Sequence, residues 1–492
     1  MSTLKIWKNG EFSLFHFTGE QKLSELLSQA GYLVDHPCGG RGVCGKCAVE
    51  VTGCVSEPNA AEKKAGKRLS CQAVVLGDAE VFLPDSRDTR IQMSGRETEA
   101  ADPMAEGIGA AVDIGTTTLA MKLYDMESGK TLSSAARTNP QRSIAADVMG
   151  RIGAAMAGQG ETLKNLIRDA LSKMLDEACG KAGVSRDDVS VMVITGNTTM
   201  LYLLEGSDPS ALSHAPFEAD RLFGEESSLF GKKVYYPACM NAFVGADISC
   251  AVLASRMYTK DETSLLCDIG TNGEIALWKD GRLYVSSTAA GPAFEGAGIS
   301  CGCGSIDGAV DKVRVEEGRI EAHTIGDVPA VGVCGSGLID AIAAFLQTGD
   351  IDETGAVEGD DLPLRDGVAL IPKDVRAVQL AKAAIAAGIR TILETAGVEE
   401  EEISALYIAG GFGSHLNVSS AAAIGLIPQS LEKKAVVIGN AALSGAAEIL
   451  LNRRQKELAY KLASESQHIN LGGNPKFNEN YIEEMMFGDD EL

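Results

Sequence analysis

One short pattern occurs twice in this chain and constrains the fold more than any other feature. In each copy an aliphatic run leads into Asp-Ile-Gly-Thr, first at residues 111–118 and again at residues 265–274. A glycine turn after a strand lets backbone N–H groups approach phosphate oxygens closely. A single copy is more often a plain strand-end turn. Two copies predict two phosphate loops in two α/β cycles, which start at Gly109 and Ser264.

The acidic residues of these loops are the candidate catalytic groups. Asp113 and Asp268 stand at strand ends, where a carboxylate can hold Mg²⁺ or orient an attacking water. Glu274 follows the second loop and is a third candidate, and Asp247 and Glu295 are further candidates for positioning water or metal. The candidate phosphate-binding residues are Gly115, Thr116, Thr117, Thr118, Gly270, Thr271, Asn272 and Gly273.

A third element, residues 406–413, is a predicted strand that leads into a double glycine. Such a turn suits a backbone that lies flat against a nucleotide base or ribose. The candidate nucleotide-binding residues here are Gly410, Gly411, Phe412 and Gly413. His415 follows, and its two interpretations are a nucleotide contact and, as the favoured one, a residue at a helix start.

Five of the twelve cysteines lie between Cys38 and Cys71. Cys38, Cys44 and Cys47 have the spacing C-x5-C-x2-C, and the distant Cys71 completes the four thiolates of a 2Fe–2S cluster. Glycines in this loop leave N–H groups free to point at a negative cluster. Zinc ligands usually come as two short-spaced doublets, and Cys71 has no such neighbour. The pattern therefore predicts a plant-type cluster, with Cys54 outside the ligand set.

Composition shifts divide the chain into segments. Around the cysteines we expect a hairpin at 4–17, a helix at 24–30 and strands at 48–55 and 79–83. A polar stretch without aliphatic runs follows, and alternating aliphatic strands and alanine-rich helices come after it. The predicted segments are a cysteine-rich domain at 1–85, a polar linker at 86–107, a first α/β lobe at 108–260, and a second α/β lobe with the double-glycine element and a C-terminal tail at 261–492.

The formal net charge is −24, from 44 basic and 68 acidic residues. This balance argues against nucleic acid or an anionic membrane as the main partner. The sequence has no apolar stretch of about 20 residues that would span a bilayer, and its first residues do not resemble a signal peptide. Twelve cysteines without an export signal indicate a reducing compartment. We therefore expect a cytoplasmic protein.

The motifs together resemble a known family. The two loops and residues 409–413 resemble the phosphate and adenosine motifs of the acetate and sugar kinase, Hsp70 and actin superfamily, and residues 195–199 and 439–443 resemble its connecting helices. With the ferredoxin-like region, residues 290–297 and 334–340 resemble the ATP-dependent reductive activators of corrinoid proteins. The resemblance covers nearly the whole chain. Better-known members are longer, with an extra domain where this chain has only a linker.

The resemblance implies a β-grasp ferredoxin-like domain followed by a two-lobed actin/Hsp70-like ATPase domain, with a 2Fe–2S cluster, ATP and Mg as cofactors. It also implies a homodimer that takes electrons from a low-potential donor and reduces Co(II) to Co(I) in a corrinoid protein. Two alternatives stay open: a phosphotransferase with a structural or regulatory cluster, and an activator of another low-potential metalloenzyme. The latter requires a cluster shared across a dimer by Cys301 and Cys303, which otherwise pack a glycine turn.

Overall fold

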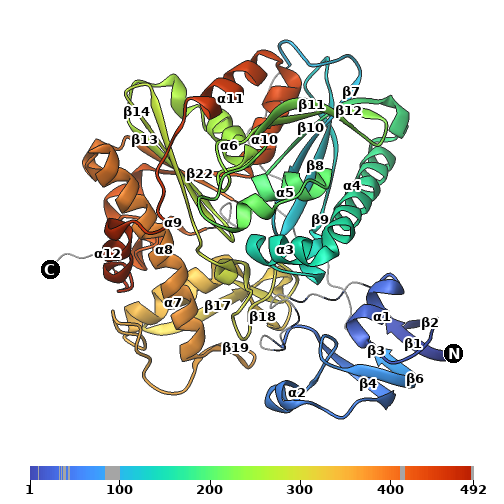
Figure 1. The fold of residues 1–492 in the computed structure, drawn as a ribbon. Coiled ribbons are helices and arrows are strands. Elements are labelled where there is room, and N and C mark those ends of the chain that lie inside the picture. Colours follow the sequence, from blue (N-terminus) through green and yellow to red (C-terminus); the bar gives the residue numbers. More distant parts are fainter. Residues whose placement is uncertain are drawn as a thin grey trace. The chain divides into compact units, whose positions relative to one another are not determined.

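The computed structural model describes residues 1–8, 10–32, 34, 36, 40, 42, 45–83, 100–410 and 416–488. The chain divides into two compact units (Figure 1). The first comprises residues 1–88 and 140–167, and the second comprises residues 89–139 and 168–492. Residues 140–167, which we predict within the first ATPase lobe, thus group with the N-terminal residues in this division.

The N-terminal residues form a mixed sheet in the order β2-β1-β6-β4-β5, with β3 paired to β6. Strands β1 and β6 are parallel, while β1–β2 and β4–β6 are antiparallel. Helix α1 buries three leucines in the same core as Leu4 and Ile6 of β1, which gives a β-grasp arrangement. The bounds are β1 Ser2–Lys8, β2 Glu11–Phe17, β3 Gln21–Lys22, α1 Leu23–Gln29, β4 Ala48–Val55, α2 Ala60–Ala65, β5 Arg68–Leu69 and β6 Val74–Phe82.

The predicted hairpin, helix and strand at 48–55 are confirmed, but the last strand of this region begins five residues before the predicted residue 79. Gly77 and Asp78 interrupt the apolar pattern there. The backbone of Val74 and Val75 nevertheless pairs with Gln21 and Lys22, so main-chain hydrogen bonds extend the strand where the side-chain pattern fails.

The second unit contains two six-stranded sheets that share one four-stranded arrangement. In each, an antiparallel meander of three strands is followed by a strand that returns parallel to the first. The first sheet has the order β11-β12-β10-β7-β8-β9 and the second β22-β21-β13-β14-β15-β23. The duplicated motif of the sequence therefore opens two equivalent sheets.

The strand bounds of the first sheet are β7 Ile108–Ile114, β8 Thr118–Asp125, β9 Thr131–Thr138, β10 Val189–Gly196, β11 Phe223–Leu229 and β12 Lys232–Ala238. Those of the second sheet are β13 Ser264–Ile269, β14 Gly273–Lys279, β15 Arg282–Thr288, β21 Ala405–Ala409, β22 Ala435–Gly439 and β23 Gln467–His468.

Helices α6 and α10 lie between the two sheets (Figure 1). Residues of both sheets join these helices in one apolar core, which includes Ala111 of β7 and Leu266 of β13. The two helices touch backbone to backbone, because a Cβ at Gly445 would lie 2.0 Å from the carbonyl oxygen of Cys250. The helix bounds are α3 Val148–Ala154, α4 Gly160–Ala182, α5 Thr198–Glu205, α6 Ala246–Ser255, α7 Gly335–Thr348, α8 Pro372–Ala396, α9 Val418–Ala423, α10 Ala441–Leu451, α11 Arg454–Ser464 and α12 Pro475–Glu483.

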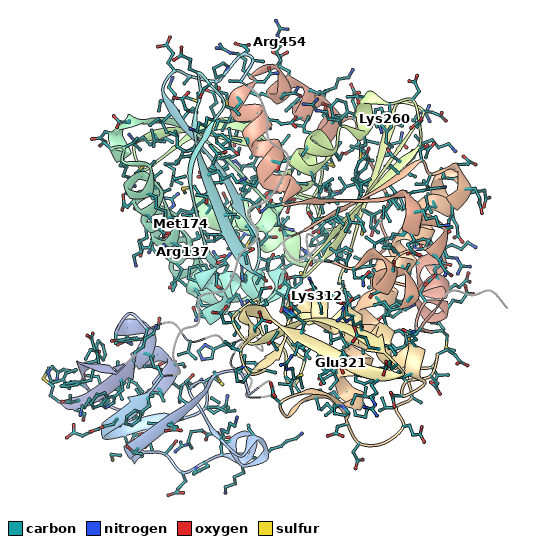
Figure 2. All side chains as sticks on the ribbon, turned by 180° about the vertical axis from the view of Figure 1, so that it is seen from behind. Arg137, Met174, Lys260, Lys312, Glu321 and Arg454 are labelled. Carbon is teal, nitrogen blue, oxygen red and sulfur yellow. The ribbon has the colours of Figure 1, made fainter. Side chains whose placement is uncertain are left out.

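An additional small sheet, in the order β17-β16-β18, lies between β15 and β21 in the sequence. Helix α7 packs on β16, and Figure 2 labels Lys312 and Glu321 on this part of the molecule. The bounds are β16 Ala309–Glu316, β17 Arg319–Thr324 and β18 Gly332–Val333. Strands β19 Leu362–Arg365 and β20 Val368–Leu370 form a separate two-stranded antiparallel sheet. Within the residues described, no helix combines the length and apolarity needed to cross a bilayer.

Candidate functional site

Both predicted phosphate loops are tight turns between antiparallel strands. In the first, the Gly115 N–H donates to the Thr118 carbonyl at 2.9 Å; in the second, the Gly270 N–H donates to the Asn272 carbonyl at 3.0 Å. A Cβ at Gly115 would lie 2.7 Å from the Thr118 carbonyl oxygen, so only glycine fits the first turn. At Gly270 the nearest atom would be 3.7 Å away, so packing does not exclude a side chain there.

Glu295 joins the two loops. The Thr117 hydroxyl donates to Glu295 Oε2, and the Thr271 hydroxyl donates to Glu295 Oε1 at 3.0 Å. The structure therefore brings one candidate threonine of each loop to a single carboxylate. We predict Glu295 from the sequence only as a group that positions water or metal, and this bridge between the loops is an additional feature.

Asp113, at the end of β7, accepts a hydrogen bond from Asn440 Nδ2 at 2.9 Å. Asn440 also caps helix α10, because its side-chain oxygen accepts from the Leu443 N–H at 2.8 Å. Burial raises the pKa of Asp113 to about 6, and the Asn440 hydrogen bond opposes that rise. Asn440 thus joins the helix N-terminus to the first candidate carboxylate.

The other acidic candidates share one electrostatic environment. Burial, together with the charges of Asp113 and Glu295, raises the pKa of Asp268 to about 7. Burial and the charges of Asp268 and Asp113 raise the pKa of Asp247 to about 8. Burial and the charges of Asp247 and Asp268 raise the pKa of Glu274 well above its ordinary value. The negative charge of each carboxylate opposes ionisation of its acidic neighbours. A divalent cation bound among them would reduce this repulsion.

Mg²⁺ at a phosphate site usually takes one or two carboxylates and completes its shell with phosphate oxygens and water. Among the residues placed by the structure, no three His, Cys, Asp or Glu side chains form a ligand set for one ion. Asp113 and Asp268, at corresponding positions of the two sheets, are the residues that would face a nucleotide-bound Mg²⁺.

The predicted adenosine element begins beside the second phosphate loop. Strand β21 pairs with β13 and ends at Ala409, and the following Gly410 has a φ of +114°. A Cβ there would lie 2.5 Å from the Ile269 carbonyl oxygen and 3.0 Å from Asp268 Oδ1. Glycine at 410 is therefore needed for close packing against the Asp268 strand. The other residues of this prediction, Gly411, Phe412, Gly413 and His415, lie outside the described residues.

The two segments likened to connecting helices share one local design. Each is a strand that ends in Gly-Asn, after which Asn197 caps α5 and Asn440 caps α10. The sequence contains this repeated Gly-Asn signal, but we do not predict the contact between Asn440 and Asp113 from it. Gly245, at the start of α6, presses on the first segment, because a Cβ there would lie 2.6 Å from the Thr198 nitrogen.

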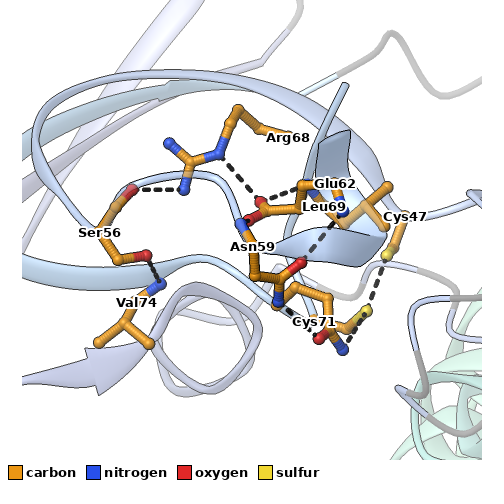
Figure 3. A network of polar contacts seen from close by, with 9 residues as sticks. Cys47, Ser56, Asn59, Glu62, Arg68, Leu69, Cys71 and Val74 are labelled. Atoms are coloured by element: carbon orange, nitrogen blue, oxygen red, sulfur yellow. Dashed lines mark hydrogen bonds and ion pairs between the residues drawn. The ribbon is translucent and has the colours of Figure 1, made fainter. Parts of the chain in front are cut away.

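In the N-terminal region, Cys47 precedes β4 and Cys71 follows β5. Both are buried, and their Sγ atoms lie 3.3 Å apart (Figure 3). The contact with Cys47, followed by burial, raises the pKa of the Cys71 thiol. Two buried sulfurs directed at one another fit two ligands of a common cluster. Cys38 and Cys44 lie outside the described residues.

A polar network fixes the position of Cys71 (Figure 3). Glu62 accepts from Arg68 Nε at 2.9 Å, from the Leu69 N–H at 3.0 Å and from the Asn59 N–H at 3.0 Å. These bonds tie helix α2 to β5, which ends two residues before Cys71. Gln72 Nε2 then donates to the Gly40 carbonyl at 2.6 Å and so joins the network to the cysteine loop.

The remaining cysteine candidates have other surroundings. Cys54 is exposed on β4, at a register irregularity opposite β6. Cys301 and Cys303 flank Gly302, where a Cβ would lie 2.2 Å from the Gly296 carbonyl oxygen. Their backbones pair with Val333. The Cys303 N–H donates to the Val333 carbonyl at 2.8 Å, and the Val333 N–H donates to the Cys301 carbonyl at 2.9 Å.

The fold and the two candidate sites define a class of protein in which a ferredoxin domain for a 2Fe–2S cluster is joined to an ATPase domain with paired phosphate loops. Family models agree with each part. The 2Fe-2S iron-sulfur cluster binding domain matches residues 9–76, the RACo middle region matches 108–260, and the C-terminal domain of RACo, the ASKHA domain, matches 262–492. The middle-region match covers the same residues, 108–260, as the predicted first ATPase lobe.

The chain belongs to the family of reductive activators of corrinoid proteins. It is 35% identical over 425 residues to the corrinoid activation enzyme RamQ of Eubacterium limosum, covering 78% of this chain and 71% of the relative. It is 26% identical over 420 residues to the [Co(II) methylated amine-specific corrinoid protein] reductase of Methanosarcina barkeri, covering 77% of each. A solved structure titled "Reductive activator for corrinoid,iron-sulfur protein" matches with a TM-score of 0.72 and 25% identity, over 99% of both chains.

Proposed function

We propose that this protein transfers one electron from its 2Fe–2S cluster to the Co(II) of a corrinoid protein and regenerates Co(I) in a reaction that hydrolyses ATP. One observation carries the proposal: a single chain holds the buried Cys47–Cys71 pair of a ferredoxin domain and two phosphate loops joined at Glu295. The cysteine pair belongs to a centre that transfers one electron at a time. The phosphate loops belong to a site where nucleotide binding would change the conformation of the protein.

Energetics explain why the two would be combined. Plant-type 2Fe–2S clusters have potentials near about −400 mV, and the family resemblance implies a lower cobalt couple. A one-electron deficit of roughly 100–200 mV corresponds to about 2–5 kcal/mol. Differential binding to two conformations shifts an equilibrium by energies of this order. ATP binding that favours one conformation of the complex would therefore supply the missing driving force.

In this proposal, Cys38, Cys44, Cys47 and Cys71 hold the cluster, which supplies one electron at a time. The turns at Gly115–Thr118 and Gly270–Gly273 bind phosphate oxygens. Gly410, Gly411, Phe412 and Gly413 are assigned to nucleoside binding.

The acidic residues divide the work of hydrolysis. Asp113, kept largely ionised near neutral pH by Asn440, faces the nucleotide-bound Mg²⁺. Asp268, whose pKa is raised by burial and by the charges of Asp113 and Glu295, orients the attacking water and accepts its proton. Glu274 lies beside it, at 7% exposure, and contributes to the same buried charge cluster.

The proposal extends to the partners. A low-potential electron donor returns one electron to the cluster after each transfer, so that one Co(II) is reduced for each electron received. The family resemblance further supports a homodimer, a cytoplasmic location and a chain divided at 1–85, 86–107, 108–260 and 261–492.

The test is direct. The protein is reduced and mixed with candidate corrinoid proteins in the Co(II) state, and the Co(I) absorption is followed with and without MgATP. Co(I) should form only with MgATP and only with an intact cluster, so Cys71→Ser should abolish the change. A phosphorylated small molecule without any cobalt change would instead support the phosphotransferase alternative.

A further inference from the structure

Both carboxylate oxygens of Glu295 accept hydrogen bonds from threonine hydroxyls of the two phosphate loops, which bind ATP in the proposed function. The Thr117 hydroxyl of the first loop donates to Oε2, and the Thr271 hydroxyl of the second loop donates to Oε1. A threonine hydroxyl has a single hydrogen to donate. Each hydroxyl can therefore serve Glu295 or a phosphate oxygen, but cannot donate fully to both.

We propose that Glu295 is a positioning residue that latches the two phosphate loops together without nucleotide and gives up both hydroxyls to the terminal phosphate of ATP. This inference rests on the proposed function, since it requires ATP at the two loops. Like charges support it, because a carboxylate and a phosphate repel one another when they compete for the same donors. ADP lacks the competing group, so the latch would distinguish ATP from ADP.

The backbone around Glu295 suits a residue that changes position. Glu295 ends a single turn, Pro292–Glu295, which lies between Gly291 with a φ of +79° and Gly296 with a φ of +75°. The Gly291 N–H donates to the Thr271 carbonyl at 2.9 Å, so the turn is attached to the second loop by its backbone as well. The two glycines are the positions where backbone angles can change at low cost.

A movement of Glu295 on its release would also move residues outside the nucleotide site. The Gly296 carbonyl lies against Gly302, where even a Cβ would approach to 2.2 Å. The residues on either side of Gly302 are hydrogen-bonded to Val333 at 2.8 and 2.9 Å. Val333 ends β18, and Cys334 directly after it is the last residue before α7. The occupancy of the Glu295 latch is thereby coupled to the β16–β18 sheet and helix α7.

The test compares nucleotide affinities of the full-length protein. Dissociation constants for MgADP and for Mg-bound β,γ-imido-ATP are measured by calorimetry for the wild type, Glu295→Gln and Glu321→Gln. Gln can accept from only one of the two hydroxyls, which frees the other for phosphate. In Glu295→Gln the ratio of the dissociation constant for MgADP to that for Mg-bound imido-ATP should rise about tenfold. This factor is the effect on affinity expected from about one additional hydrogen bond to a charged phosphate oxygen. Glu321, exposed on β17, is the control and should leave the ratio unchanged.

A second readout follows the coupling. Hydrogen exchange at residues 300–304 and 332–334 should change on addition of imido-ATP but not of ADP, and Glu295→Gln should show the changed state with either nucleotide or none. If Glu295→Gln folds poorly, Glu295→Asp replaces it, because a side chain one methylene shorter cannot reach both loops. An unchanged ratio, or weaker imido-ATP binding, would overturn the latch. Failure of the wild type to bind either nucleotide would overturn the proposed function as well.

Discussion

Replacing Asn440 with serine should shift the pH dependence of ATP hydrolysis while leaving the fold intact. Asn440 has two roles: its oxygen caps α10, and its amide donates to Asp113 at 2.9 Å. Serine is about as good an N-cap as asparagine, so Asn440→Ser keeps the first role and removes the second. The variant isolates the contact between the helix N-terminus and the carboxylate.

The size of the effect follows from the lost hydrogen bond. A hydrogen bond to a charged group contributes about 1.5–3 kcal/mol, and one pKa unit corresponds to about 1.4 kcal/mol. Asp113 has a pKa of about 6 because burial outweighs the Asn440 bond. Without that bond the pKa should rise by roughly one to two units. Hydrolysis near pH 7 should then fall about two- to tenfold and recover as the pH rises past the new pKa.

The folding stability of Asn440→Ser should likewise be reduced only at pH values where Asp113 is ionised. A group whose pKa is raised by folding loses stabilisation as the pH rises from its unfolded value through its folded value. Asn440→Ser and wild type should therefore unfold at similar temperatures near pH 4, where Asp113 is protonated in both. The variant should be less stable by about 1.5–3 kcal/mol above pH 8.

The assay is the pH profile of MgATP hydrolysis together with thermal unfolding at several pH values. Asn197→Ser is the matched control, since Asn197 caps α5 in the same Gly-Asn context and bonds to the Thr199 N–H, with no carboxylate involved. A profile of Asn440→Ser that superimposes on the wild type, or an equal shift in Asn197→Ser, would refute this reasoning.

Three further outcomes are expected. Cys71→Ser should lose the visible absorption and EPR signal of the 2Fe–2S cluster, while Cys54→Ser, exposed on β4, keeps both; an intact Cys71→Ser spectrum would contradict the ligand assignment. Asp113→Ala and Asp268→Ala should each lose most MgATP hydrolysis with an unchanged cluster spectrum, and full activity in both would remove the phosphate-loop assignment. Gly410→Ala should weaken nucleotide binding measured by calorimetry, because its Cβ would lie 2.5 Å from the Ile269 carbonyl oxygen; wild-type affinity would show that this strand end is not part of the site.

The sequence predicts the features that depend on neighbouring residues. The two Asp-Ile-Gly-Thr turns, the hairpin and the β4 strand each rest on a short pattern, and the structure has them at those positions. The class of fold follows from these patterns because the same strand-and-turn unit appears twice. The family comparison then agrees with the resemblance that the motifs carry.

The contacts within the candidate site depend on tertiary packing and could not be predicted this way. Asn440 and Asp113 are 327 residues apart, and Thr117 and Glu295 are 178 apart. Such pairs meet only after the two sheets have packed on α6 and α10. The repeated Gly-Asn before a helix indicates a helix N-cap. The pattern does not indicate which distant carboxylate the asparagine amide will contact.

The central claim is that ATP drives an electron transfer that the cluster cannot complete alone. The most direct measurement is the equilibrium fraction of Co(I) in the corrinoid partner, recorded by its absorption in a redox buffer poised at the measured potential of the cluster. We predict that Co(I) accumulates with MgATP and stays low with MgADP or with no nucleotide. An equal Co(I) fraction with and without MgATP would contradict the account, even if the protein holds the cluster and hydrolyses ATP.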